Sequence, residues 1–302
     1  ENIIIGSGLT ALATAYGLPP TSRTLVLTGG EHDNIGYYDA SSKIPCQNQG
    51  FGGLGSFWHG VIPMHYSDML ASIPVDIVTK VFKIFYPRES PENFVNSPWL
   101  FVPYNPIRPK LHWGKLLKSR AKFLSMAHTT AQRVRQKNGV WEVQANGQLL
   151  KTNRLWIAAG ALGTPALLER SGIYSSAILP TASDHLILYV GQTNRKKHPQ
   201  IPSPQVKHTS SGYWMKASSD FGASGLITTK PARFGYKVLD QGVEQRSAFG
   251  LPASSVVKKL ISAGSLGLIA EAAFNKLGLF PDSQMLSVYA QIRVGDAYTR
   301  LS

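Results

Sequence analysis

The sequence contains the same local unit twice, an apolar strand followed by a glycine-rich turn and the start of a helix. The first copy is NIIIGSGLTALATA at residues 2–15, and the second is WIAAGALGTPALLERSGI at residues 156–173. In the first copy Gly6, Gly8 and Ala11 fit the pattern G-x-G-x-x-G/A between a strand and a helix. Gly6 permits a tight turn, and Gly8 lets the backbone approach a pyrophosphate at the helix N-terminus. The pattern therefore favours a parallel sheet that binds a dinucleotide at the carboxyl ends of its strands.

The end of the next strand departs from the usual dinucleotide site. TLVLTGG at residues 24–30 predicts that strand, and a carboxylate at its end normally binds the adenosine ribose. Thr28 holds this place, and Glu31 comes three residues late. Three alternatives stay open: Glu31 reaches back, Thr28 and the backbone hold the ribose, or the site binds weakly or not at all. We favour the second.

Composition excludes several classes of protein. The chain has 302 residues, 43% of them hydrophobic, which is enough for one large domain or two interleaved ones. No apolar run reaches the ~18–20 residues of a membrane-spanning helix, and no signal-peptide pattern is present. Its single cysteine, Cys46, excludes an internal disulfide and fits a reducing compartment. No Cys/His spacing matches a zinc site, so we expect no metal. The reducing compartment that the single cysteine fits favours a cytoplasmic location.

The chain is strongly basic, with 31 Lys and Arg against 17 Asp and Glu and a net charge of +14. The basic residues are scattered and match no nucleic-acid-binding motif, so we expect no nucleic-acid partner. Two basic amphipathic helices, expected at 68–86 and 253–280, either cover a sheet or lie at a membrane surface. Peripheral membrane association, an anionic ligand and a protein partner therefore stay open.

Between the two glycine units the sequence predicts an antiparallel excursion. Asn138-Gly139 and Asn146-Gly147 are hairpin turns between alternating runs, so residues 128–160 predict three strands that deliver the strand of the second unit. The other expected elements are strands at 185–190 and 285–294, a β-rich stretch at 213–250, helices at 68–85, 115–124 and 253–280, an extended Pro-rich segment at 87–109, and a glycine-rich loop at 50–60.

Five segments carry a family resemblance. The segment IAAGALGTPALLERSGI resembles the second signature of the glucose–methanol–choline (GMC) oxidoreductases, which are flavoproteins, and the first glycine unit resembles their FAD-binding turn. GGLGSFWHG at 52–60 is similar to their Gly-Gly-x-Ser loop, and more so to the variant with a Trp in pyranose-oxidase-like members. SDHLILYV at 183–190 and VGDAYTRLS at 294–302 resemble two later strands. The matches follow the family's order and cover about half of the chain.

The resemblance implies an α/β fold: an FAD-binding, Rossmann-like parallel sheet with an antiparallel β excursion and a second, smaller α+β substrate or cap domain. The two glycine units are then neighbours in one sheet. The implied FAD-binding domain comprises residues 1–67, 115–191 and 285–302, and the implied substrate or cap domain comprises 68–114 and 192–284.

The resemblance also assigns the site. Ser56 is expected to bond the phosphate or the flavin ring edge, and the backbone near Val134 to bond the adenine. His59, close to the flavin, is the candidate proton acceptor, and Phe57 stands where some relatives attach the flavin covalently through a His. Non-covalent FAD is therefore expected against Gly6, Ser7, Gly8, Leu9, Thr10, Thr28, Gly29, Gly52, Gly53, Gly55, Ser56, Trp58, His59, Val134, Ala158, Ala159, Gly160, Asp296 and Ala297.

The family's C-terminal catalytic His is absent, since no His follows His208. Three explanations stay open: the sequence lacks a C-terminal part, the base is His59, His65 or His185, or the protein no longer oxidises alcohols. The abrupt end favours the first. The remaining histidines, among them His112, are expected at the surface. The resemblance implies an FAD-dependent oxidoreductase that oxidises a CH–OH group of a sugar or other small alcohol. The alternative is a catalytically degenerate flavin-fold protein that acts as a scaffold or partner subunit.

Overall fold

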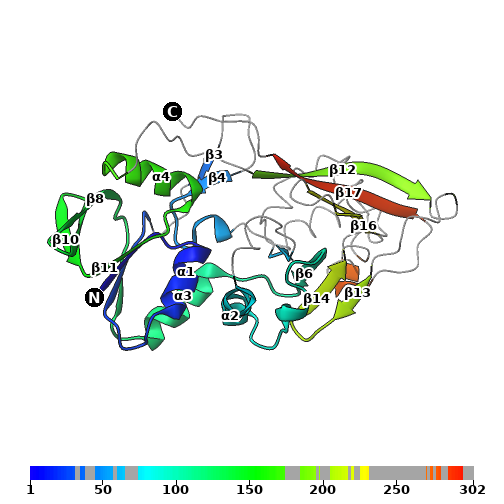
Figure 1. Cartoon of the computed structure of the whole chain (residues 1–302), viewed down its shortest axis with the longest axis horizontal. Helices are drawn as coiled ribbons and strands as arrows, with labels where there is room; N and C mark the ends of the chain where they lie inside the picture. The colour runs from blue at the N-terminus through cyan, green and yellow to red at the C-terminus, as the bar shows by residue number, and fades with distance from the viewer. Residues whose placement is uncertain are drawn as a thin grey trace. The chain divides into compact units, whose positions relative to one another are not determined.

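The computed structural model divides the chain into two compact units, each described by itself (Figure 1). Unit 1 comprises Glu1–Phe57, Ile107–Ala182 and Thr299–Ser302, and unit 2 comprises Trp58–Pro106 and Ser183–Tyr298. The structure describes residues 1–30, 35–37, 45–56, 60–64, 74–173, 184–194, 197, 205–216, 219–220, 225–230, 270, 273–274, 277–279 and 285–294.

A parallel sheet forms the centre of unit 1. Its strand order is β11-β1-β2-β7, and all three pairings are parallel. Ile3 pairs with Leu25 on one side and with Leu155 on the other, so the strands of the two glycine units are direct neighbours, as the sequence predicted. The strands are β1 (Asn2–Ile5), β2 (Thr24–Leu27), β7 (Phe123–Met126) and β11 (Arg154–Ile157).

Two helices, α1 (Leu9–Gly17) and α3 (Pro109–Ser119), lie side by side and contact the parallel sheet (Figure 1). The α1 residues Ala11, Leu12 and Ala15 are buried, at the spacing of one helical face. Trp113 of α3 is fully buried as well. The two helices thereby place their N-termini close to the end of β1.

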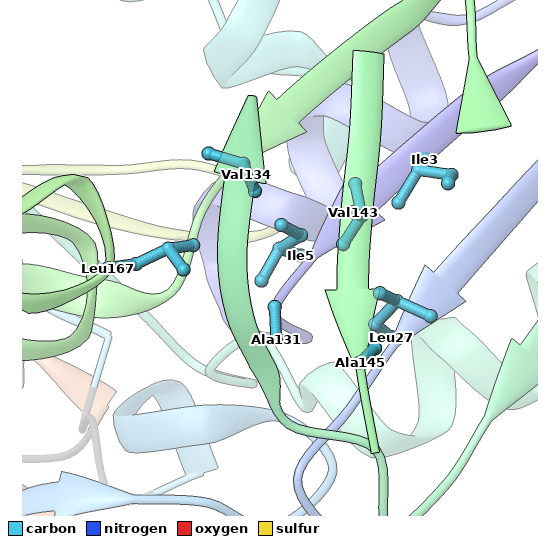
Figure 2. Close-up of a cluster of buried hydrophobic side chains, with 8 residues drawn as sticks. All are labelled: Ile3, Ile5, Leu27, Ala131, Val134, Val143, Ala145 and Leu167. Carbon is cyan, nitrogen blue, oxygen red and sulfur yellow. The ribbon is translucent and has the colours of Figure 1, made fainter. Parts of the chain in front are cut away.

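An antiparallel meander and a helix complete the core of unit 1. β8 (Ala131–Lys137), β9 (Val140–Ala145) and β10 (Gln148–Thr152) follow each other through two Asn-Gly turns with positive φ, as predicted. Figure 2 shows apolar side chains of β8 and β9 beside those of β1, so this layer and the parallel sheet share one core. The buried cluster comprises Ile3, Ile5, Leu27, Ala131, Val134, Val143, Ala145 and, from α4 (Gly160–Arg170), Leu167.

Unit 2 contains a four-stranded sheet with an aromatic core. Its order is β13-β14-β6-β5, and Trp214 of β14 packs in parallel planes against Phe94 and Phe82, with ring centroids 4.1 and 5.8 Å away. Phe82 comes from α2 (Val75–Phe85), which begins directly after Pro74. The other elements are β5 (Ile62–Pro63), β6 (Trp99–Pro103), η2 (Pro91–Asn93), β13 (Val206–His208) and β14 (Gly212–Lys216).

The C-terminal strand belongs to an antiparallel sheet of unit 2. β17 (Met285–Val294) pairs with β12 (Asp184–Asn194) and with β16 (Gly225–Lys230), which in turn pairs with β15 (Ser219–Asp220). Both long strands were predicted as strands. The sequence placed them with the dinucleotide-binding sheet, whereas their hydrogen bonds group them with unit 2.

Two sequence expectations were wrong in detail. The helix expected at 115–124 starts earlier, ends at Ser119 and is followed by β7, the fourth parallel strand. The Pro-rich segment 87–109 contains η2 and β6 instead of being extended throughout. Within the described residues, no helix has the length and apolar character needed to cross a membrane.

Candidate functional site

The two glycine corners meet at the carboxyl edge of the parallel sheet. Ala158 N–H donates to Ile5 O at 2.8 Å, and Gly6 N–H donates to Leu27 O at 2.9 Å. Gly6 has a φ of +108°, and a Cβ there would lie 2.2 Å from Ala158 O. Only glycine fits so close to another backbone in this conformation. Gly160, also with positive φ, then begins α4.

The start of α1 is open to an anion. Gly8 is the N-cap of this helix, no side chain caps its first turn, and a Cβ at Gly8 would meet nothing within 4 Å. The first N–H groups of a helix have no partner inside the helix and carry the positive end of its dipole. Leu9 and Thr10 form this first turn, so the predicted pyrophosphate position offers free donors and free space.

The glycine-rich loop lies against this turn. Residues Gly53–Ser56 form the short helix η1, and a Cβ at Gly53 would lie 3.2 Å from Gly8 Cα. Asn48 fixes the loop at two points. It is the last residue of β4 (Pro45–Asn48), which pairs with β3 (Ile35–Tyr37). Its Oδ1 accepts from Gly50 N–H at 2.8 Å, and its Nδ2 donates to Gly53 O at 3.1 Å. Loop and turn are therefore close without any side chain between Gly53 and Gly8.

Helix α3 supports both the loop and the turn. Trp113 Nε1 donates to Ser7 O at 2.8 Å, and its ring meets Phe51 edge-to-face with centroids 5.8 Å apart. Pro109 lies 3.1 Å from the position that a Cβ on Gly55 would take. Neither these supports nor the role of Asn48 was predicted from the sequence. A Trp in a basic helical run carries no sign of its contacts, because they come from residues more than 50 positions away.

One hydroxyl in the loop lacks a partner. Ser56 Oγ is buried and makes no hydrogen bond among the described residues. A buried hydroxyl without a partner is unfavourable by about 1–3 kcal/mol, so this atom suits a ligand acceptor. Helix N–H groups, glycine backbone and an unpaired hydroxyl are donors for phosphate oxygens, and the residues present thus fit the pyrophosphate of FAD.

Ser7 and Thr28 face the protein interior. The two hydroxyl oxygens are 3.2 Å apart, and Thr28 Oγ1 also donates to Gly30 O at 3.4 Å. Only 1% of Thr28 and 5% of Ser7 is exposed. Their hydroxyls thus stabilise the turn from behind, and the expectation that the Thr28 side chain holds a ribose does not fit this geometry. Gly29 follows Thr28 beside Gln49.

The backbone of Val134, expected to bond an adenine, also has a protein partner. Its N–H donates to Ser171 Oγ at 2.9 Å, and the neighbouring Gln132 O accepts from Arg170 Nε at 3.2 Å. Residues at the end of α4 thereby cover this edge of β8. This N–H therefore has a protein partner in the structure, and the expected bond between the backbone near Val134 and an adenine stays a prediction.

The remaining predicted site residues divide into two groups. Gly6, Ser7, Gly8, the loop Gly52–Ser56 and the corner Ala158–Gly160 come together in unit 1. The candidate proton acceptor His59 lies outside the described residues, and the same holds for Trp58, Asp296, Ala297, Glu31 and His65. Within the described part of the chain, no three His, Cys, Asp or Glu side chains gather as metal ligands.

One histidine behind the turn is less exposed than expected. Tyr16 Oη and His112 Nδ1 are 3.1 Å apart across the contact between α1 and α3. Burial lowers the pKa of the His112 imidazole, and the Lys115 ammonium lowers it further. Burial also raises the pKa of Tyr16. His112 is thus a partly buried, neutral hydrogen-bond partner of Tyr16 at neutral pH.

Comparisons with known proteins return only loose structural similarity. No family model and no curated protein matches the chain. Among solved structures, NikD, an unusual amino acid oxidase essential for nikkomycin biosynthesis, is 12% identical over 68% of this chain and 60% of its own, with a TM-score of 0.33. An FAD-dependent oxidoreductase from Chaetomium thermophilum is 12% identical over 64% of this chain and 53% of its own, with a TM-score of 0.42. Glycine oxidase from Geobacillus kaustophilus is 11% identical over 63% of this chain and 60% of its own, with a TM-score of 0.32.

The chain spans between about half and three fifths of the length of these three structures. Its fold class follows from its own strand order: an α/β unit with a parallel sheet and an antiparallel meander, and a second unit with antiparallel sheets. This confirms the predicted α/β class with a parallel sheet and an antiparallel excursion. The second unit, which was expected to be the smaller one, is the longer of the two in residues.

Proposed function

We propose that unit 1 binds FAD non-covalently and that the protein is an FAD-dependent oxidoreductase acting on a CH–OH group. One observation carries the proposal: an uncapped helix N-terminus, a clear space at Gly8 and the unpaired Ser56 hydroxyl belong to one turn-and-loop assembly. Such an assembly is what the pyrophosphate of a dinucleotide requires. The GMC resemblance of the same segments supports flavin over nicotinamide, since a nicotinamide site needs neither the loop nor the second signature.

Each element of the turn-and-loop assembly has a separate task in this proposal. The N–H groups of Leu9 and Thr10 donate to phosphate oxygens, and Gly8 leaves the room for them. Ser56 donates its hydroxyl proton to a phosphate or to the ring edge. The backbone of Gly52–Gly55 provides a surface without side chains, on which a flat ring system can lie.

FAD, when bound, would accept a hydride from the carbon of a sugar or other small alcohol. The protein must then take the hydroxyl proton, and we propose His59 for this role because its imidazole titrates near neutral pH. Phe57 offers no atom for a covalent flavin bond, so the cofactor is released when the protein unfolds. We propose a cytoplasmic location for this activity.

A scaffold or partner-subunit function is the second candidate. It is favoured by the closed adenosine side of the site, where the Thr28 hydroxyl and the Val134 N–H both have protein partners. A flavin fold that kept its phosphate turn and lost adenosine anchoring would bind FAD weakly. This candidate predicts a colourless protein whose melting temperature does not rise with added FAD.

Replacing Gly8 tests the proposal. A valine at this position meets no protein atom within 4 Å at its Cβ but fills the space assigned to the phosphates. We expect Gly8→Val to fold with a melting temperature near that of the wild type and to lose FAD binding in a fluorescence titration. The same substitution at Gly17, which lies in open space at the other end of α1, is the control and should bind normally.

Three results would contradict the proposal. In the first, the wild-type protein neither carries nor binds FAD. In the second, Gly8→Val protein binds FAD as tightly as the wild type. In the third, no alcohol or sugar bleaches the visible absorbance of the FAD-loaded protein under anaerobic conditions. The first result favours the scaffold function, the second overturns the placement of the pyrophosphate, and the third overturns the reaction.

A further inference from the structure

We propose that Ser7 is a positioning residue that holds the loop Gly50–Ser56 against the phosphate turn before any cofactor binds. The consequence for FAD rests on the proposed function, whereas the effect on the loop does not. Sequence analysis expected Ser7 at the cofactor; the structure turns its hydroxyl away from the open space and into the protein.

The Ser7 hydroxyl joins two segments that are distant in sequence. Its Oγ accepts from Gly52 N–H at 3.2 Å and lies 3.2 Å from Thr28 Oγ1, which donates to Gly30 O. The Gly52 N–H, the two hydroxyls and the Gly30 carbonyl all have a partner if the Ser7 hydroxyl donates to Thr28 Oγ1. Each hydroxyl then donates one hydrogen bond and accepts one. The side chain of Ser7 therefore links the loop to the end of β2.

A substitution of Ser7 can remove its hydroxyl without removing its backbone contacts. Trp113 bonds the Ser7 carbonyl, so this contact survives any change of the side chain. Without the hydroxyl, the buried Gly52 would keep an N–H with no partner. A buried donor without an acceptor is unfavourable, and the loop would relieve it by moving Gly52 toward water.

Movement of the loop would affect FAD binding because the other end of the loop carries the unpaired Ser56 hydroxyl. Ser56 follows Gly52 within the same short turn, and its Oγ lies 2.5 Å from the position of a Cβ on Gly52. A displaced Gly52 would therefore shift the Ser56 hydroxyl beside it. Pre-organised donors bind more tightly than donors that must be ordered on binding.

The first test uses the protein without cofactor. We expect Ser7→Ala to raise amide hydrogen exchange of residues 50–56 at least tenfold, with little change in β9. Thr28→Val keeps the Ser7–Gly52 bond and should raise this exchange by less. Thr14→Ala removes an exposed hydroxyl bond to Thr10 O on the same helix and should leave the loop unchanged.

The second test titrates FAD by fluorescence. We expect Ser7→Ala to weaken binding about tenfold, equivalent to about 1.4 kcal/mol, and Ser7→Thr, which restores a hydroxyl, to recover part of the affinity. Faster loop exchange with weaker binding supports the proposal.

Unchanged loop exchange in folded Ser7→Ala overturns the proposal. Faster exchange with unchanged FAD affinity overturns it as well, because the position of the loop would then not affect binding. If wild-type protein binds no FAD, the proposed function fails, and the exchange experiment alone decides whether Ser7 holds the loop.

Discussion

At the scale of single residues, the phosphate turn divides its tasks among neighbours that look alike in sequence. Gly6 is required by the protein, because another backbone lies where its side chain would be. Gly8 is not required by the protein and points to a ligand. Ser7, between them, serves the interior. The pattern G-x-G identifies the turn, and the distinction between packing and binding comes only from what surrounds each position.

His112 should make stability depend on pH. Its folded-state pKa is lowered, so the unfolded chain takes up a proton more readily as pH falls through the ordinary value of about 6.5. Stability is therefore complete above that pH and declines below it, by under about 1 kcal/mol because the ring is partly exposed. Urea unfolding between pH 8 and 5 measures the decline.

The matched variant is His112→Gln, whose amide can still bond Tyr16 but does not titrate. The decline in unfolding free energy should be smaller in this variant than in the wild type. Equal pH dependence of both proteins would show that His112 does not contribute.

At the scale of elements, α1 is held at both ends by α3 and the residue after it. Trp113 bonds the turn before α1, and the guanidinium of Arg120 donates to carbonyls at the C-terminal end of α1. Its Nη1 lies 2.8 Å from Ala15 O and 3.0 Å from Leu18 O. The carbonyls at a helix C-terminus lack partners and attract positive charge, so this contact stabilises α1 in two ways.

Replacing Arg120 by alanine should destabilise unit 1 by about 1–2 kcal/mol, because two charge-assisted hydrogen bonds are lost. Urea unfolding measures the change. Lys118→Ala, at an exposed position on α3, should change the unfolding free energy by less than about 0.5 kcal/mol. Arg120→Lys should recover only part of the loss, since an ammonium cannot reproduce the planar fork. Equal effects of Arg120→Ala and Lys118→Ala would refute the capping role.

Helix α2 shows why a sequence pattern of basic and apolar residues is ambiguous. Its lysines were candidates for contact with an anionic surface, but Lys80 pairs with Asp76 at 3.2 Å and Lys83 with Glu92 at 3.8 Å. The exposed side chains of Ile77 and Val81 remain. These pairs leave this helix with little net charge, and the expected membrane-surface association stays a prediction.

At the scale of the whole molecule, local patterns predicted the elements better than their grouping. The glycine units and Asn-Gly hairpins were found because each is defined within a few residues. Strand β7 was not predicted, because it has only four residues and directly follows a helical run. Of its first two residues, both apolar, Phe123 is buried and Leu124 is exposed. The pairing of β17 with β12 depends on backbone hydrogen bonds between segments 100 residues apart, and nothing local encodes it. The protein partners beside Val134 were not predictable for the same reason, since they come from the end of α4.

Separate cores predict separate local stabilities. Phe101 is fully buried, and its described aromatic neighbours Phe82, Tyr86 and Trp214 all belong to unit 2. Phe101→Leu should lower stability there by about 1–2 kcal/mol and speed amide exchange in β6 and β14 more than in β1. Val143→Ala, in the core of unit 1, should do the reverse. Equal acceleration in both sheets by either variant would mean that the two units open together.

The position of β1 has a consequence for synthesis. Asn2 pairs with Thr24 of β2 on one side and with Arg154 of β11 on the other. During synthesis β2 therefore follows β1 closely, whereas β11 is made only after residues 58–106 of unit 2. At ribosomal rates the interval is on the order of 10 s. Throughout it the nascent chain presents Ile3, Ile4 and Ile5 beside an unpaired strand edge, a template for aggregation. Newly made chains should therefore depend on chaperones most strongly between the emergence of β2 and that of β11.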